Sequence, residues 1–256
     1  MSQAARCRAL SGKIFLKNLG IPSQPYLLIG NAQAELAITE TEQTQPDYTN
    51  PAGGNACAFK EIDTVGLTLT VFDFKADNLS KAVFGNSTAG NATPIVNEAI
   101  TIFTDGALVP TARVINSSVA VVVSIGATNY VQGTDYIVSA GGIVVIPGSA
   151  LDVAVLAGVG TPKSVAGVVD YTPRASDIIQ AITTSAGVYA VKLEGYNKAD
   201  NNKEELWTIH RMLLGPTGSF SLISREFGSF VLNASITADS TRPPGESQYF
   251  NIEVVG

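Results

Sequence analysis

The sequence predicts an all-β protein with one short helix, built from two packed β-sheets in a sandwich or barrel, plus an inserted small β module. Three observations predict this class: many short runs in which apolar and polar residues alternate, turn residues between these runs, and a single early segment with a helical pattern. The chain has 256 residues, which is enough to bury a substantial core. Hydrophobic residues make up 45% and charged residues only 15%, so we expect contacts beyond those within a monomer to cover part of the apolar surface.

The first strands come from the N-terminal third of the chain. "GKIFLKN" and "YLLIGNAQAELAIT" begin the series, and "VGLTLTVFDF" follows. In the last run Leu67 and Leu69 alternate with Thr68 and Thr70, which is typical of a half-buried strand.

The segment "DNLSKAVFG", residues 77–85, predicts the helix. Asp77 can cap its first turn, and Gly85 is placed to end it. We expect this helix to cover an end or a face of the sheet.

The middle of the chain reads as a compact β module over residues 95–170. Its predicted strands are "EAITIFTD", "SVAVVVS", "YIVSAGGIVVIP" and "DVAVLAG". "RASDIIQA" favours a further helical turn, and four long strand patterns then complete the chain from "GVYAVKLEGYNK" to "SQYFNIEVV". The predicted organisation is therefore a core of residues 1–94 and 171–256 interrupted by the inserted module.

A long polar stretch, "ETEQTQPDYTNPAGGNACAF" at residues 40–59, separates two predicted strands. Hairpin connections usually need only about two to five residues. The stretch is therefore a disordered loop, a functional lid, or an arm that contacts another molecule.

The residue types needed for catalysis are scarce. His210 is the single histidine and lies in a strand pattern, so we interpret it as a packing or lining residue. Trp207 is interpreted as a core or subunit-interface anchor. No G-x-S-x-G elbow and no phosphate-binding loop occurs, so the sequence predicts no enzyme, no catalytic residue, no cofactor and no metal site.

The net charge and the targeting signals limit the classes of partner that we expect. The net charge of −6 has the wrong sign for a protein that grips nucleic acid phosphates. Cys7 and Cys57 do not form a disulfide framework. The N-terminus lacks the apolar core of a signal peptide, and the apolar stretch at 141–160 reads as two strands, so we expect synthesis in the cytoplasm and no membrane partner.

The order of these elements resembles the major tail tube proteins of long-tailed, siphovirus-like bacteriophages. The resemblance rests on a strand that ends in Asp73 and leads into a short helix with Asn78, Leu79 and a terminal Gly85. It also rests on two late strands, one with the pattern "LEGYN" and one with "LWTIHRMLL". It covers residues 10–90 and 185–256, and the middle block also has the look of phage tail β modules.

The resemblance implies a structural virion protein whose copies form stacked, hexameric rings and conduct DNA during ejection. The partners that it implies are other copies of the chain, a tape-measure protein, and tail-tip and tail-terminator proteins, with DNA only in transit. It makes residues 40–59 a ring-stacking arm and places the inserted module on the outer wall of the tube. The arm candidates are Glu42, Pro46, Asp47, Tyr48, Asn50 and Pro51.

Strand alternation then suggests which side chains face the channel. If the apolar residues of each strand point into the sandwich, their neighbours point outward, which on an inner sheet is toward the lumen. The candidates are Glu35, Thr39, Thr68, Thr70, Lys192 and Glu194. The alternative function is an immunoglobulin-like adhesin or a tail-tip binding module, because such folds also use short strands at regular spacing.

Overall fold

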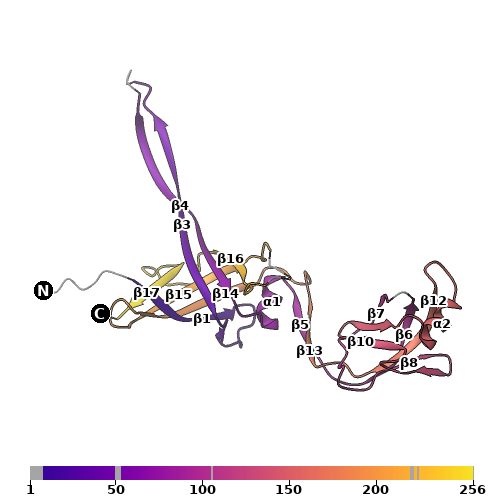
Figure 1. The fold of residues 1–256 in the computed structure, drawn as a ribbon. Coiled ribbons are helices and arrows are strands. Elements are labelled where there is room, and N and C mark those ends of the chain that lie inside the picture. The colour runs from indigo at the N-terminus through magenta and orange to yellow at the C-terminus, as the bar shows by residue number, and fades with distance from the viewer. Residues whose placement is uncertain (1–7, 50–52, 105, 220–221, 224, 256) are drawn as a thin grey trace. The chain divides into compact units, whose positions relative to one another are not determined.

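The computed structural model describes residues 8–49, 53–104, 106–219, 222–223 and 225–255. Over these residues the protein is mostly β-strand, with two short helices and several antiparallel sheets (Figure 1). This confirms the predicted all-β class.

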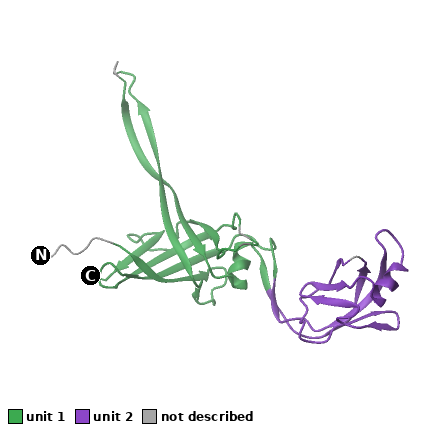
Figure 2. Ribbon diagram, viewed as in Figure 1, with its two compact units in different colours: residues 1–87, 179–256 green, residues 88–178 purple. Residues whose placement is uncertain are grey.

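The chain divides into two compact units (Figure 2). Unit 1 comprises residues 1–87 and 179–256, and unit 2 comprises residues 88–178. Unit 2 extends further at both ends than the module that the sequence predicts.

The difference comes from two short strands at the crossings between the units. β5 (Asn86–Gly90) and β13 (Ser176–Gln180) pair with each other as a separate two-stranded sheet. β13 covers most of the segment for which the sequence favours a helical turn, and that prediction is wrong. Ladder hydrogen bonds to β5 hold this segment extended, and its local pattern does not encode them.

Unit 1 contains one eight-stranded sheet, in which every pairing is antiparallel. The order is β2-β1-β14-β15-β16-β4-β3, and β17 pairs with β15. The strands are β1 (Leu10–Asn18), β2 (Leu27–Leu28), β3 (Ala32–Pro46), β4 (Asn55–Val71), β14 (Val188–Asn197), β15 (Lys203–Leu214), β16 (Phe230–Ile236) and β17 (Phe250–Val254).

β15 divides this sheet into two packed layers. One edge of β15 pairs with β14, and its other edge pairs first with β17 and then, near the C-terminal end, with β16. Leu16 of β1 and Leu69 of β4, from distant parts of the strand order, belong to one buried cluster. The two sheets expected from the sequence are therefore layers of one continuous sheet around a common core.

The helix α1 (Ala76–Ala82) packs against this core through Ala82 and Leu79. Its N-cap is Lys75, without a side-chain capping hydrogen bond, and Asp77 lies within the first turn. Its C-cap is Val83, and the N–H of Gly85 donates to the carbonyl of Ser80 at 2.7 Å, so Gly85 takes part in ending the helix as predicted, whereas the cap role predicted for Asp77 is wrong. The helix thus begins two residues earlier than a cap at Asp77 would give, and the side-chain amide of Asn78 donates hydrogen bonds to the carbonyls of Ile29 and Asp73 outside it.

Unit 2 is a small sandwich of two antiparallel sheets, ordered β6-β12-β8-β9 and β10-β11-β7. Buried Ile102 and Val123 from the first sheet and Ile143 from the second belong to one core. The elements are β6 (Ile95–Phe103), β7 (Leu108–Pro110), β8 (Val122–Ile125), β9 (Thr128–Tyr130), β10 (Tyr136–Ser139), β11 (Gly142–Val145), α2 (Ala150–Leu156) and β12 (Ser164–Tyr171).

The helix α2 replaces the strand predicted at "DVAVLAG". Ser149 is its N-cap and accepts a hydrogen bond from the backbone N–H of Asp152 at 3.2 Å. Leu151 and Val155, four residues apart, are buried, whereas Val153 between them is exposed. This spacing buries one face of a helix, so the run of apolar residues does not alternate as a strand would require.

Candidate functional site

The stretch predicted as an arm is a β-hairpin. β3 and β4 continue as one antiparallel ladder beyond the core, and Figure 1 shows the hairpin extending away from the rest of unit 1. Val65 is buried, but its ladder partner Ile38 is half exposed, and both strands are solvent-exposed from Thr39 outward. Most of the stretch 40–59 is therefore paired strand, in which the hydrogen bonds of the β3–β4 ladder satisfy backbone groups without a core.

A bulge and a few polar contacts shape the arm. The ladder pairs Thr39 with Thr64 but Glu40 with Ile62, which leaves Asp63 as an extra residue on β4. Beyond the bulge, the ammonium of Lys60 lies 4.0 and 3.9 Å from carboxylate oxygens of Glu40 and Glu42. Exposed pairs of this kind contribute only about 0–1 kcal/mol, so backbone pairing accounts for most of the arm's local stability.

The tip of the arm presents an aromatic side chain. The backbone N–H of Asp47 donates to the carbonyl of Gly54 at 2.8 Å, and the carboxylate of Asp47 accepts from the N–H and the hydroxyl of Thr49. Tyr48, between them, is 88% exposed. Of the other arm candidates, Glu42 and Pro46 lie on β3, whereas Asn50 and Pro51 lie outside the described residues.

Three of the six residues predicted to line a channel, Glu35, Thr68 and Thr70, line one pocket of unit 1. Glu35 lies opposite Thr68 in the β3–β4 ladder, and Thr70 lies opposite Gln33 in the same ladder. Thr39 is further along, where its hydroxyl accepts a hydrogen bond from Thr64 at 3.1 Å.

Lys192 and Glu194 lie instead on β14, in the other layer of the sheet. Glu194 pairs across the ladder with Lys13, and the ammonium of Lys192 lies 5.4 Å from the ring centroid of Tyr26. β15 and β16 separate β14 from β4 in the strand order. The role of the six residues as a channel lining stays a prediction. Alternation gives the side of a strand but not the layer to which the strand belongs.

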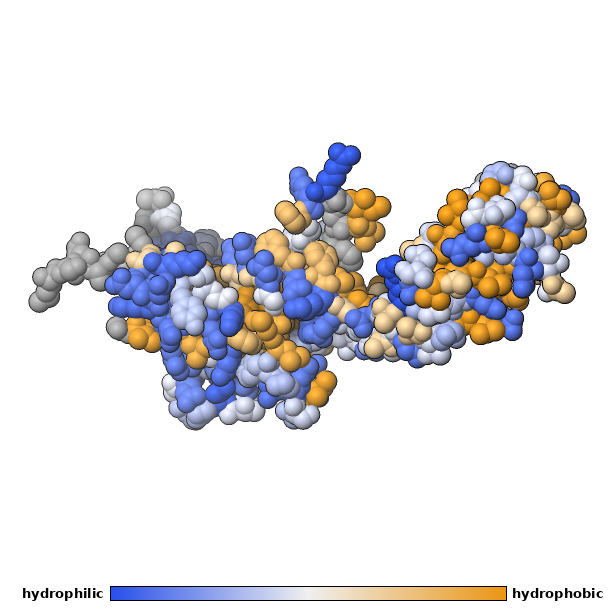
Figure 3. Space-filling view, turned by 60° about the horizontal axis from the view of Figure 1, so that its bottom comes forward, coloured by the Kyte–Doolittle hydropathy of each residue, from blue (hydrophilic) through white to orange (hydrophobic). Residues whose placement is uncertain are grey.

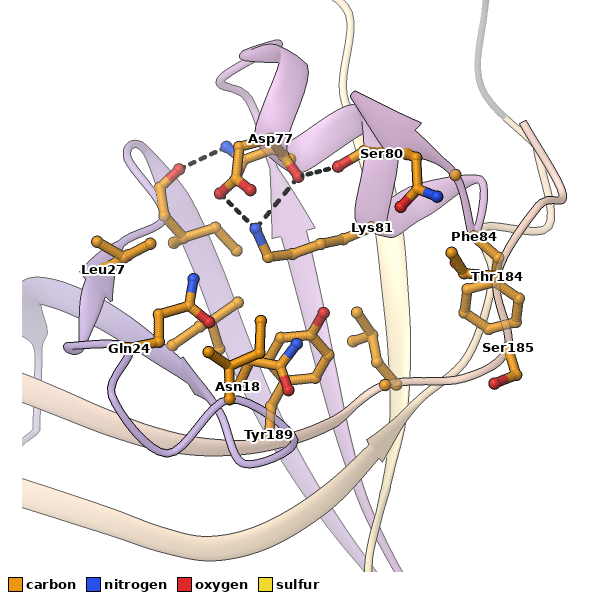
Figure 4. A pocket seen from close by; sticks show the side chains of 18 of the residues that line it. Asn18, Gln24, Leu27, Asp77, Ser80, Lys81, Phe84, Thr184, Ser185 and Tyr189 are labelled. Atoms are coloured by element: carbon orange, nitrogen blue, oxygen red, sulfur yellow. Dashed lines mark hydrogen bonds and ion pairs between the residues drawn. The ribbon is translucent and has the colours of Figure 1, made fainter. Parts of the chain in front are cut away.

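A pocket of 280 Å³ lies beside α1 in unit 1 (Figure 4). Its polar side chains include Asn18, Gln24 and the ion-paired Asp77 and Lys81, and its apolar side chains come mainly from the strands and loops around β2. Figure 4 shows Asp77 and Lys81 on one side and Gln24 and Asn18 facing them, with Tyr189 below. No sequence pattern indicates this pocket, because its members come from four separate segments and share no motif.

Two features of the pocket concern its polar atoms. The Oε1 atom of Gln24 is buried and has no hydrogen-bond partner among the described residues. Burial, with a smaller effect of the Asp77 carboxylate, raises the pKa of the Tyr189 phenol above its ordinary value, so this hydroxyl stays protonated.

His210 and Trp207 lie on β15. His210 is buried, and burial, with a smaller effect of Arg242, lowers its pKa below the ordinary value. The Trp207 ring stacks on Phe250 with centroids 6.2 Å apart, and the guanidinium of Arg8 lies 4.8 Å from the Trp207 ring centroid. Both side chains therefore contact other parts of unit 1.

Within the described part of the chain, no cluster of three or more His, Cys, Asp or Glu side chains could hold a metal ion. Neither helix in those residues has the length and apolar character of a membrane span.

Comparison with known proteins assigns the family. Residues 8–253 match the family described as "Protein of unknown function UCP028589". The chain belongs to this family. No curated protein matched the sequence.

Proposed function

We propose that this member of the UCP028589 family is a structural virion protein, the major tail tube subunit of a long-tailed bacteriophage. Its copies form stacked, hexameric rings, and the channel conducts DNA during ejection. The observation that carries the proposal is the β3–β4 arm, which continues well past the core of unit 1 and ends in an exposed aromatic residue. A monomer gains little by ordering such an arm, whereas an assembly gains a contact.

Exposed apolar side chains support an assembled state. The segment between β15 and β16 carries Leu222, Ile223 and Phe227, all almost fully exposed. Figure 3 shows further hydrophobic residues on the surface of both units. Apolar surface of this extent is typical of proteins whose neighbours cover it, and copies of the same chain are the expected neighbours.

The net negative charge of the chain is consistent with a channel through which DNA passes. A net charge of −6 on every subunit gives a ring that does not attract phosphates strongly, so that DNA slides through it. The further partners in this proposal are a tape-measure protein inside the tube and tail-tip and tail-terminator proteins at its ends. The protein is then part of the virion tail after synthesis in the host cytoplasm.

Unit 2 has its own core and is attached to unit 1 through the β5–β13 ladder. We place it on the outer wall of the tube, because an inserted module is tolerated where it leaves the channel open. Cryo-electron microscopy tests this placement, and density for unit 2 inside the channel contradicts it.

Electron microscopy of the purified protein at high concentration tests the main proposal. Rings or hollow tubes are the expected result. A second candidate, an immunoglobulin-like adhesin or tail-tip module, is favoured by the small antiparallel sandwich of unit 2. A protein that stays monomeric and binds a carbohydrate or a receptor supports this alternative and contradicts the tube.

A further inference from the structure

We infer that the pocket beside α1 is the docking site for Tyr48 from a second copy of the chain. This inference rests on the proposed assembly and specifies which surface receives the arm. Its basis is the match between one exposed side chain and one pocket, together with the distance between them within a single chain.

The pocket has the size and lining for one large amphipathic side chain. Its volume of 280 Å³ lies just below the range of about 300–1,000 Å³ that is typical of pockets for drug-sized ligands. Leu16, Ile21 and Leu28 offer apolar contacts, while Gln24 offers an acceptor. Asp77 and Lys81 at its edge neutralise each other, so the pocket favours a neutral ligand over an ion.

The orphan acceptor indicates what the ligand must carry. The buried Oε1 atom of Gln24, which has no partner among the described residues, needs a donor. A tyrosine side chain supplies an apolar ring and a hydroxyl donor together. The exposed apolar residues of the β15–β16 segment, such as Phe227, lack a donor and leave this acceptor unpaired.

Tyr48 is the tyrosine best placed for this role. It is 88% exposed at the tip of the arm, whereas Tyr196 on the body of unit 1 is 44% exposed. Hydrogen bonds of the tip to Asp47 fix the local turn, which lowers the entropy lost on docking.

The occupant has to be another copy, because the arm carries Tyr48 away from its own pocket. Ile29 lines the pocket, and β3 starts at Ala32 and runs without interruption to Pro46. At about 3.3 Å per residue, the two ends of β3 are about 45 Å apart. When Tyr48 of one copy enters the pocket of the next, the contact is head-to-tail, and such contacts repeat from copy to copy. The axial repeat of the assembly therefore should not exceed about 63 Å, the extended span of the chain from Ile29 to Tyr48.

Disulfide trapping tests the contact directly. In a Cys7→Ser, Cys57→Ser background that keeps Tyr48, one preparation carries Thr49→Cys and a second, with a tag of different mass, carries Ser185→Cys at the pocket edge. Oxidation of the mixture should yield a covalent heterodimer. The matched control replaces Thr49→Cys by Tyr196→Cys and should yield about tenfold less. Equal yields from both pairs overturn the inference.

Electron microscopy of the same samples separates this inference from the proposed function. Tubes without the cross-link from Thr49→Cys overturn the docking site and leave the tube intact. The cross-link without rings or tubes supports the docking site and contradicts the tube. Absence of both contradicts both.

A double-mutant cycle tests the hydrogen bond. The critical concentration for assembly, measured by sedimentation, should rise about 30-fold or more in Tyr48→Ala, as for a buried aromatic anchor, and should stay unchanged in Tyr196→Ala. Tyr48→Phe and Gln24→Leu should each raise it less, and the double variant should show less than the product of the two effects. Fully independent effects contradict the assignment of Gln24 as the acceptor.

Discussion

Arg8 donates two hydrogen bonds to one carboxylate oxygen of Glu205, from Nε at 3.1 Å and from Nη2 at 2.7 Å. Glu205 is only 8% exposed, and its Oε2 atom also accepts a hydrogen bond from the indole N–H of Trp207 at 3.3 Å. These bonds connect the segment before β1 to β15, with β14 between them in the sheet.

Arg8→Ala should lower the free energy of unfolding by about 1–2 kcal/mol, because it removes charge-assisted hydrogen bonds from a buried carboxylate and a cation–π contact with Trp207. The half-exposed Arg8 side chain keeps the loss below that of a fully buried pair. Urea unfolding of the wild type and of Arg8→Ala measures this loss of free energy. In a Glu205→Gln background the same substitution should cost less, and an equal cost in both backgrounds contradicts the role of the charge.

The same pair gives a pH dependence. The Arg8 guanidinium lowers the pKa of Glu205 below its ordinary value of 4.5. Its contribution to stability is therefore complete above about pH 4.5 and is lost as the pH falls through the lower pKa of the folded state. Unfolding measured from pH 6 to pH 3 should show a smaller decline in Glu205→Gln than in the wild type.

His210 should cause a loss of stability at a higher pH. Burial lowers its pKa in the folded state below the ordinary value of 6.5, so the unfolded state binds the proton more tightly. Stability is complete above about pH 6.5 and declines as the pH falls toward the folded-state pKa, by at most about 1.4 kcal/mol per pH unit. His210→Asn should remove this decline between pH 7.5 and pH 5.5, and an unaltered slope in the variant contradicts the assignment.

The arm should be dispensable for folding and necessary for assembly. Deletion of residues 44–55 removes exposed parts of β3 and β4 and leaves the buried parts of both strands. Circular dichroism should match the intact protein, while sedimentation should show no long polymers. Normal tubes from the deletion variant contradict the role of the arm.

Unit 2 should fold independently of unit 1, since its buried residues form a separate core. Residues 88–178 expressed alone should unfold cooperatively in urea. Tyr136 is fully buried, and its hydroxyl donates to the carbonyl of Val121 at 2.6 Å. Tyr136→Phe should lower the free energy of unfolding by about 1–2 kcal/mol, because it leaves the carbonyl of Val121 unpaired. A fragment of residues 88–178 that shows no cooperative transition contradicts independent folding.

Much of the fold could be predicted because alternation reflects burial directly. Leu67 and Leu69 are buried, and Thr68 and Thr70 between them are less so, as the period of two requires. The predictions for two elements were wrong because the local pattern is ambiguous. The continuous apolar run of α2 suits a strand or a helix, and the extended form of β13 depends on its pairing with β5.

The sequence by itself determined the all-β class, the faces of the strands, and the low content of residue types that catalysis needs. Tertiary structure alone decided that the polar stretch after Thr39 is paired strand, because ladder hydrogen bonds join backbones and leave little trace in the side chains. It also decided that Glu35 and Glu194 lie on different layers and that Gln24 and Tyr189 share a pocket. Such relations depend on which strands pair and where the sheet folds over itself, and these are set by contacts between residues far apart in the chain.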